Sequence, residues 1–191
     1  EKYAGTARFI LACNYSSKII APIQSRCAVF RFSQLKEDEI TGYLKKIAKS
    51  ENLNVDEDAY KAIIYVSEGD MRKAINILQT ASILKGKVTE QTVYSATGKA
   101  DPLAVRKMIA ISLEGNFREA RKVLMSLMVE QGLAGEDIIK EIHNQVFDLS
   151  IPDTRKIQLL EKVGEYEFRI TEGSNTRIQL EALLAQFGKK D

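Results

Sequence analysis

The spacing of apolar residues divides the chain into a short front segment and a long helical remainder. Residues 9–13 (Phe-Ile-Leu-Ala-Cys) form a continuous apolar run, and residues 28–32 (Ala-Val-Phe-Arg-Phe) form a second run rich in β-branched and aromatic residues. Both patterns are typical of strands, the first of a strand buried on both faces of a parallel sheet. The stretch between them predicts a short crossover that is interrupted at Pro22.

Two strands alone do not make a stable sheet. A strand buried on both faces needs neighbours, and the chain opens at Glu1 rather than at Met. We therefore expect the front segment to be the remnant of an α/β domain and the chain to be the C-terminal part of a longer protein.

After Phe32 the apolar positions recur with a helical period. Residues 34–98 predict a small bundle of four helices, with Asp56, Asp70 and Thr89 as N-caps. The predicted helices span residues 36–51, 56–69, 70–86 and 89–98.

Residues 99–191 predict a second bundle, of five helices joined by short loops. Helix starts are marked by Asp101 before a proline, by a capping-box-like pair of Asn116 and Glu119, and by Asn175. The predicted helices span residues 101–115, 116–132, about 138–146, 153–172 and 175–187. The expected fold is therefore mainly α, with a two-stranded remnant of an α/β domain over residues 1–33.

Composition adds a charge gradient to this picture. The 191 residues carry 28 Lys+Arg and 26 Asp+Glu, a net charge of +2 that argues at first against a nucleic-acid partner. Residues 1–33, however, hold five basic residues and one acid, whereas 34–98 and 99–191 each carry a net −1. The positive excess is therefore local. Two cysteines in apolar segments predict reduced thiols in a cytosolic protein (nuclear in a eukaryote), and no apolar run is long enough to span a membrane.

Most enzyme signatures are missing from the sequence. The only histidine, His143, lies in a predicted helix, and without further His or clustered Cys it predicts no zinc or other metal site. The nucleophile elbow G-x-S-x-G and the phosphate-binding loop G-x-x-x-x-G-K-[ST] are both absent. We therefore expect that this chain does not bind and hydrolyse a nucleotide by itself.

Three polar residues stand where they could reach a phosphate. Asn14 follows a predicted buried strand, at the edge where α/β sheets bind ligands, although its position alone favours an Asn that only caps the next turn. Arg26 precedes the second predicted strand and could reach a phosphate across an interface, or could be an ordinary surface arginine. Arg72 lies in the first turn of a helix, where a cation is disfavoured unless an anion or its neighbour Asp70 compensates it.

These segments together resemble the small subunit of replication factor C, the sliding-clamp loader of the AAA+ ATPase class, in its archaeal form. Residues 9–14 look like the sensor-1 strand, 23–27 contain the Ser-Arg-Cys motif of the family, and 68–76 (Glu-Gly-Asp-Met-Arg-Lys-Ala-Ile-Asn) look like the sensor-2 helix. Residues 168–175 and 179–183 are similar to the last two helices of the family. The resemblance covers essentially the whole chain.

The resemblance implies a role for each of these residues. Asn14 would be sensor 1, acting on the γ-phosphate or its attacking water, and Arg26 would be an arginine finger acting on ATP of the neighbouring subunit. Arg72 would be sensor 2, acting on ATP of its own subunit, with Met71 as an apolar wall beside the nucleotide. Lys18 would be a candidate for contact with a DNA phosphate.

The resemblance also implies domains, cofactors and partners. Residues 34–98 would be the helical lid and residues 99–191 the collar that joins subunits into a ring. ATP with Mg would act in the intact protein, whose partners would be other loader subunits, the sliding clamp and primer–template DNA, with no membrane.

The chain departs from the family at its front, where the Walker A loop and the Walker B box are absent, so the resemblance does not extend to ATP or clamp binding by this chain alone. Two alternatives remain: an assembly module without ATPase activity, and a helix-turn-helix DNA-binding protein built from residues 56–85.

Overall fold

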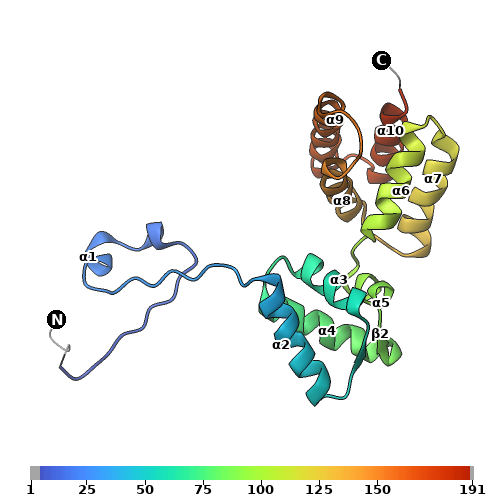
Figure 1. Ribbon diagram of the computed structural model, residues 1–191. Helices are drawn as coiled ribbons and strands as arrows, with labels where there is room; N and C mark the ends of the chain where they lie inside the picture. The colour runs from blue at the N-terminus through green and yellow to red at the C-terminus, as the bar shows by residue number, and fades with distance from the viewer. Residues whose placement is uncertain (1–4, 190–191) are drawn as a thin grey trace. The chain divides into compact units, whose positions relative to one another are not determined.

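The computed structural model describes residues 5–189, except the side chains of residues 84 and 85. The first four residues, which include Lys2 of the basic front segment, and the last two lie outside this range. The chain divides into two units, one ending at Gln34 and the other beginning at Leu35 (Figure 1). The division falls close to the point at which the sequence pattern changes from strands to helices.

The first unit holds a 3₁₀ turn and one short helix, η1 (Ser16–Lys18) and α1 (Ala21–Gln24). Pro22 lies in the first turn of α1, where its missing N–H leaves no intrahelical hydrogen bond unmade. The side-chain amide of Gln24 donates to the carbonyl oxygen of Ser16 at 2.9 Å. This bond connects α1 to η1 within the stretch predicted as a crossover.

The two predicted strands are not formed in the first unit. Residues 9–13 and 28–32 have no regular secondary structure and pair with no strand of the described chain, so this prediction is wrong. Their side chains lie in solvent: Phe9 is 75% exposed, Ile10 97% and Phe32 96%. A strand of this kind is stable only where other strands and helices cover it, and residues 5–189 supply no such cover.

Four helices form what we call the first bundle, residues 37–97. Their bounds agree with the predicted ranges to within two residues. They are α2 (Glu37–Ser50), α3 (Glu57–Ser67), α4 (Met71–Lys85) and α5 (Glu90–Thr97). Their apolar faces meet in one core, in which Ile40, Leu44, Ile63 and Leu78 are almost completely buried.

Two short strands, which the sequence does not predict, connect the loops of the first bundle. β1 (Asn54–Val55) and β2 (Lys87–Val88) pair in parallel and join the loop before α3 to the loop before α5. Asp56 stands at the N-cap position of α3 as predicted, but its carboxylate forms an ion pair with Lys87 at 3.0 Å instead of capping the helix. Two-residue strands are too short for the alternation by which strands are recognised.

Five helices form the second bundle, residues 102–187, which confirms the predicted five-helix arrangement. They are α6 (Pro102–Leu113), α7 (Phe117–Met125), α8 (Gly135–Phe147), α9 (Asp153–Thr171) and α10 (Thr176–Phe187). A π-helical turn, η2 (Ser126–Glu130), continues α7 inside the range predicted as one helix. A separate apolar core, which includes Met108, Ile142 and Leu184, holds the bundle together.

Side-chain caps begin three of these helices as predicted. Asp101, Asn116 and Asn175 each accept a backbone N–H of the first turn that follows. Glu119 does not complete a capping box with Asn116, because its carboxylate pairs with Lys122 at 2.7 Å. Among the described residues, no helix is both long and apolar enough to cross a bilayer.

Candidate functional site

A left-handed turn sets the start of α4. Glu68 and Gly69 have φ angles of 54° and 82°, and the first of these is in a region that residues other than glycine rarely adopt. Asp70 follows, and its carboxylate accepts a hydrogen bond from the backbone N–H of Lys73 at 3.0 Å. This cap, predicted from the sequence, fixes the first turn of α4 and therefore the place from which Arg72 leaves the helix.

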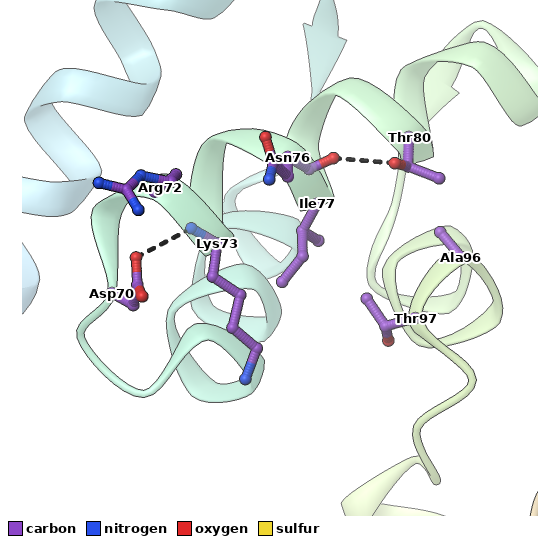
Figure 2. A pocket seen from close by; sticks show the side chains of 8 residues that line it. All are labelled: Asp70, Arg72, Lys73, Asn76, Ile77, Thr80, Ala96 and Thr97. Atoms are coloured by element: carbon purple, nitrogen blue, oxygen red, sulfur yellow. Dashed lines mark hydrogen bonds between the residues drawn. The ribbon is translucent and has the colours of Figure 1, made fainter.

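The first turn of α4 opens on a pocket of about 280 Å³ (Figure 2). The pocket is lined by residues of α4 with its N-cap, and of α5: Asp70, Arg72, Lys73, Asn76, Ile77, Thr80, Ala96 and Thr97. Figure 2 shows the side chains of Arg72 and Lys73 leaving the helix in different directions. Both are exposed, whereas Ile77 is buried. The pocket therefore has an apolar wall and cationic groups that are accessible to a ligand.

Positive charge prevails at this pocket. Arg72 and Lys73 supply two cations against the single carboxylate of Asp70, at the end of α4 where the helix dipole is also positive. The hydrogen bond from the Lys73 N–H, together with the charges of both cations, holds the pKa of Asp70 below its ordinary value. The cap is therefore ionised at neutral pH. A planar guanidinium, an ammonium group and a helix N-terminus are groups that bind phosphate oxygens.

Met71 points to a different environment from Arg72. It is partly buried and packs against the core of the first bundle, and it is not among the residues that line the pocket. Further along α4, Ala74, Leu78 and Ala81 are buried in the same core. In the helix-turn-helix alternative, α4 would be the helix that enters a DNA groove. This face of α4 is instead packed in the core of the first bundle.

The other predicted site residues lie in the first unit. Asn14, Lys18 and Arg26 are all exposed. The ammonium group of Lys18 lies 5.1 Å from the centre of the Tyr15 ring, a cation–π contact. The backbone N–H of Arg26 donates to Ile23 at 3.1 Å, which places the Ser-Arg-Cys motif directly after α1. The roles assigned to these three residues stay predictions.

His143 lies on the exposed side of α8. Its ring meets Phe147 edge to face, with 5.3 Å between the centroids. Within the part of the chain that the structure describes, no three His, Cys, Asp or Glu side chains gather as metal ligands would. His143 therefore has the environment of a surface residue of the bundle.

Comparison with known families assigns both bundles. Residues 42–83 match the AAA+ ATPase lid domain of the RCF1/5-like type, and residues 100–186 match the replication factor C C-terminal domain. The small subunit of replication factor C from Methanococcus maripaludis is 53% identical over 188 residues, which are 98% of this chain and 60% of that protein. The chain belongs to the replication factor C family.

Other replication factor C small subunits are similar over the same stretch. Those of Thermococcus kodakarensis and Pyrococcus furiosus are each 50% identical, over 98% and 100% of this chain. The chain spans only 22% and 23% of the length of these two relatives. The similarity to replication factor C is therefore continuous along the chain, while much of each relative has no counterpart in it.

The α4 side of the pocket lies within the range that matches the lid domain, whereas its α5 side, Ala96 and Thr97, lies outside that range. Arg72 and Lys73 fall within the lid range, as do Asn76 and Thr80, which lie on the same helix. Lys73, Asn76 and Thr80 are not among the site residues predicted from the sequence. Lys73, Asn76 and Thr80 recur at intervals of three and four residues, which is a signal of one helix face but not of a pocket. Thr97 comes from α5, and nothing in the sequence links it to this face.

Proposed function

We propose that the chain is the ATP-sensing and subunit-joining portion of a clamp-loader small subunit, which uses ATP to load a sliding clamp onto primed DNA. The observation that carries this proposal is the cationic pocket at the capped start of α4, because its cations, Arg72 and Lys73, lie inside the segment that matches an AAA+ lid. Residues 1–33 would belong to the nucleotide-binding domain, 34–98 would form the lid, and 99–191 the collar.

Each proposed site residue would act on a phosphate by position and charge. Arg72 would bind the phosphates of ATP held by its own subunit, and Lys73 would add a second cation at the same place. Asn14 would orient the attacking water, and Arg26 would reach the γ-phosphate held by the neighbouring subunit. Charge spreads over the phosphoryl oxygens in the transition state, so fixed donors aimed at them lower the barrier.

ATP with Mg would be the cofactor of the complete subunit. The donors at the α4 pocket fit the phosphates, since they are cationic and exposed. They do not fit the metal, because no group of carboxylates gathers among the described residues. We assign Mg to the phosphates and to parts of the subunit that this chain does not contain. Met71, turned toward the bundle core, would steady the helix that carries Arg72.

The proposed partners follow from the same family. The collar would join this chain to other loader subunits, and the assembled ring would act on the sliding clamp and on primer–template DNA. Lys18, exposed in the first unit, would contact a DNA phosphate. The alternative is an assembly module without ATPase activity. In that case neither Arg26 nor Arg72 would act on ATP.

The test measures ATP binding and DNA-stimulated ATP hydrolysis in the complete, assembled loader. Arg26→Ala should lower the turnover rate by about 10³-fold or more, as loss of an arginine finger does, and should leave the Kd for ATP unchanged. Arg72→Ala should instead raise that Kd by about 10- to 100-fold, because a hydrogen bond to a charged group is lost.

Matched controls are available on the same chain. Arg31→Ala, five residues from Arg26, and Arg118→Ala, on an exposed face of α7, should leave both quantities unchanged. Normal turnover with Arg26→Ala would overturn the finger assignment. Normal turnover and normal ATP affinity in both variants would favour the assembly module.

A further inference from the structure

A stripe of polar residues follows one face of α8. Asp137, Glu141 and Gln145 recur every four residues and therefore share one side of the helix. We call these three residues the α8 polar stripe. Glu141 is 8% exposed and Gln145 only 3%. Polar side chains that are buried this far require hydrogen-bond partners. The partners of the α8 polar stripe come from other elements as well as from α8 itself.

Two members of the stripe bind residues that precede the second bundle. The hydroxyl of Tyr65, on α3 of the first bundle, donates to the carboxylate of Glu141, with distances of 2.9 and 3.1 Å to its two oxygens. The ammonium group of Lys99, which lies between α5 and α6, donates to Asp137. We call these two contacts the α8 latch.

Residues of the second bundle hold the carboxylate of Glu141, one of the two acceptors of the latch, in place. The amide of Gln145 donates to Glu141 at 2.7 Å, and Arg106 of α6 donates to Gln145 at 2.9 Å. A second donor of Arg106 reaches Asp148, also at 2.9 Å. Glu141 is thus oriented by its own bundle, so little further ordering is needed when the hydroxyl of Tyr65 meets it.

The connection between the bundles is short and attached on both sides. Gly98 ends α5 in a left-handed conformation, with φ 63°, and the N–H of Lys99 still donates to Tyr94 of α5 at 3.3 Å. Ala100 is 2% exposed and belongs to the core of the second bundle. A connection of this kind can act as a hinge only if the contacts on either side of it release.

The latch lies close in sequence to the α4 pocket. Tyr65 is in the last turn of α3, and the Glu68–Gly69 turn leads from there directly to Arg72. A shift of the first turn of α4 would therefore bear on the end of α3 that carries the hydroxyl. The latch is well placed to transmit such a shift to α8.

We propose that the α8 latch holds the first and second bundles in one orientation, so that they move as a single body until Tyr65 and Lys99 release the stripe. Each bundle has its own apolar core, so the latch fixes orientation and is not needed for folding. This inference stands without the proposed ATPase role. Only its consequence, that a ligand at the α4 pocket would move the second bundle, rests on that role.

The test measures the distance between two spin labels, one on each bundle, by pulsed electron paramagnetic resonance on the whole chain. Labels go on Gln79→Cys in α4 and Ser174→Cys in the loop before α10, both exposed positions. The two natural cysteines, which are free and exposed, are first replaced by Cys13→Ser and Cys27→Ser. The labelled chain without further substitutions, which we call the parent, should give one narrow distance distribution.

Tyr65→Phe removes the hydroxyl that donates to Glu141, and Asp137→Asn removes the charge that pairs with Lys99, while both side chains keep nearly the same size. Each bond has a charged partner, so the fraction of molecules outside the main distance peak should rise about tenfold or more. The matched control makes the same two chemical changes inside the first bundle. Tyr43→Phe with Asp58→Asn alters an exposed tyrosine of α2 and breaks the Asp58–Lys61 ion pair, and it should reproduce the parent distribution.

Three outcomes would overturn the proposal. These are a broad distribution in the parent, a latch variant whose distribution superimposes on the parent, and a control that broadens as much as the latch variant. Circular dichroism checks that the helical content is retained. Should the double variant lose helix, Tyr65→Phe and Asp137→Asn decide separately, each with an expected broadening smaller than that of the pair. None of these readouts depends on ATP, so failure here is distinct from failure of the proposed function.

Discussion

Tyr65 meets a carboxylate that has little access to water. Burial, and the hydrogen bond to Glu141 with its negative charge, raise the pKa of Tyr65 to about 12. The neutral hydroxyl is a donor, whereas the phenolate would be a second anion beside Glu141. Deprotonation and the contact with Glu141 therefore exclude each other.

The raised pKa of Tyr65 predicts a loss of stability at high pH. In the unfolded chain the group titrates near its ordinary value of 10, and in the folded chain near 12. The folded state therefore keeps the proton longer, and the contribution of Tyr65 to stability is full below pH 10 and is lost as the pH rises toward 12. Urea unfolding at a series of pH values, compared between the parent and Tyr65→Phe, should show the difference shrinking across this window. A difference that stays constant from pH 8 to pH 12 would contradict it.

The positions of Arg72 and Met71 on α4 both follow from local signals in the sequence. Asp70 caps α4 through its carboxylate, so the first turn begins where the sequence indicates, and Arg72 leaves from it toward the pocket. Met71 lies three and seven residues before Ala74 and Leu78, which are buried, and the helical period turns it to their face. The role of Met71 as an apolar wall beside a nucleotide stays a prediction.

At the scale of elements, α8 and α10 approach closely at Gly135. A Cβ placed on this glycine would lie 2.1 Å from the Thr176 methyl group and 3.0 Å from Leu180. Gly164, in the middle of α9, differs, since a Cβ there would meet nothing within 4 Å. The same substitution therefore has opposite consequences at the two positions.

Gly135→Ala should destabilise the chain and Gly164→Ala should stabilise it. The first forces the side chain of Thr176 or the backbone that carries it to shift, and should cost about 1–3 kcal/mol, as overpacking does. The second removes backbone freedom from the unfolded chain at an open helical position and should gain about 0.5–1 kcal/mol. Urea unfolding measures both. Thr176→Ser, which removes the clashing methyl, should restore part of the loss in Gly135→Ala. Equal effects at the two glycines would show that the approach of the helices is not tight.

The helices could be predicted from the sequence, but the strands and the latch could not. Caps and a 3.6-residue period are local, so α4 begins after Asp70 and α6 after Asp101, as expected. Residues 9–13 have the pattern of a strand, but a strand also needs partners, and the described chain provides none for it. The contact of Tyr65 with Glu141 spans 76 residues of sequence, and its members resemble any solvated helix face until the fold brings them together.

At the scale of the whole chain, the two apolar cores owe nothing to the first unit. Their buried members begin at Ile40 and end at Phe187. The first unit instead exposes large apolar side chains, among them Ile10, Phe30 and Phe32. Monomeric proteins rarely expose a large apolar patch, because such patches usually contact another molecule. We therefore expect these side chains to favour association between copies of this chain in solution.

Deleting residues 1–34 should therefore leave the fold intact and reduce self-association. The two cores and the α8 latch all lie within residues 35–191, so the shortened chain should unfold at the same temperature and keep its helical circular dichroism. Sedimentation should show less concentration-dependent association, since the exposed side chains of Ile10, Phe30 and Phe32 are gone. A matched control replaces these three by Ser in the full chain and should match the deletion. A lower unfolding temperature for the deletion alone would mean that the first unit stabilises the bundles by contacts beyond its apolar side chains.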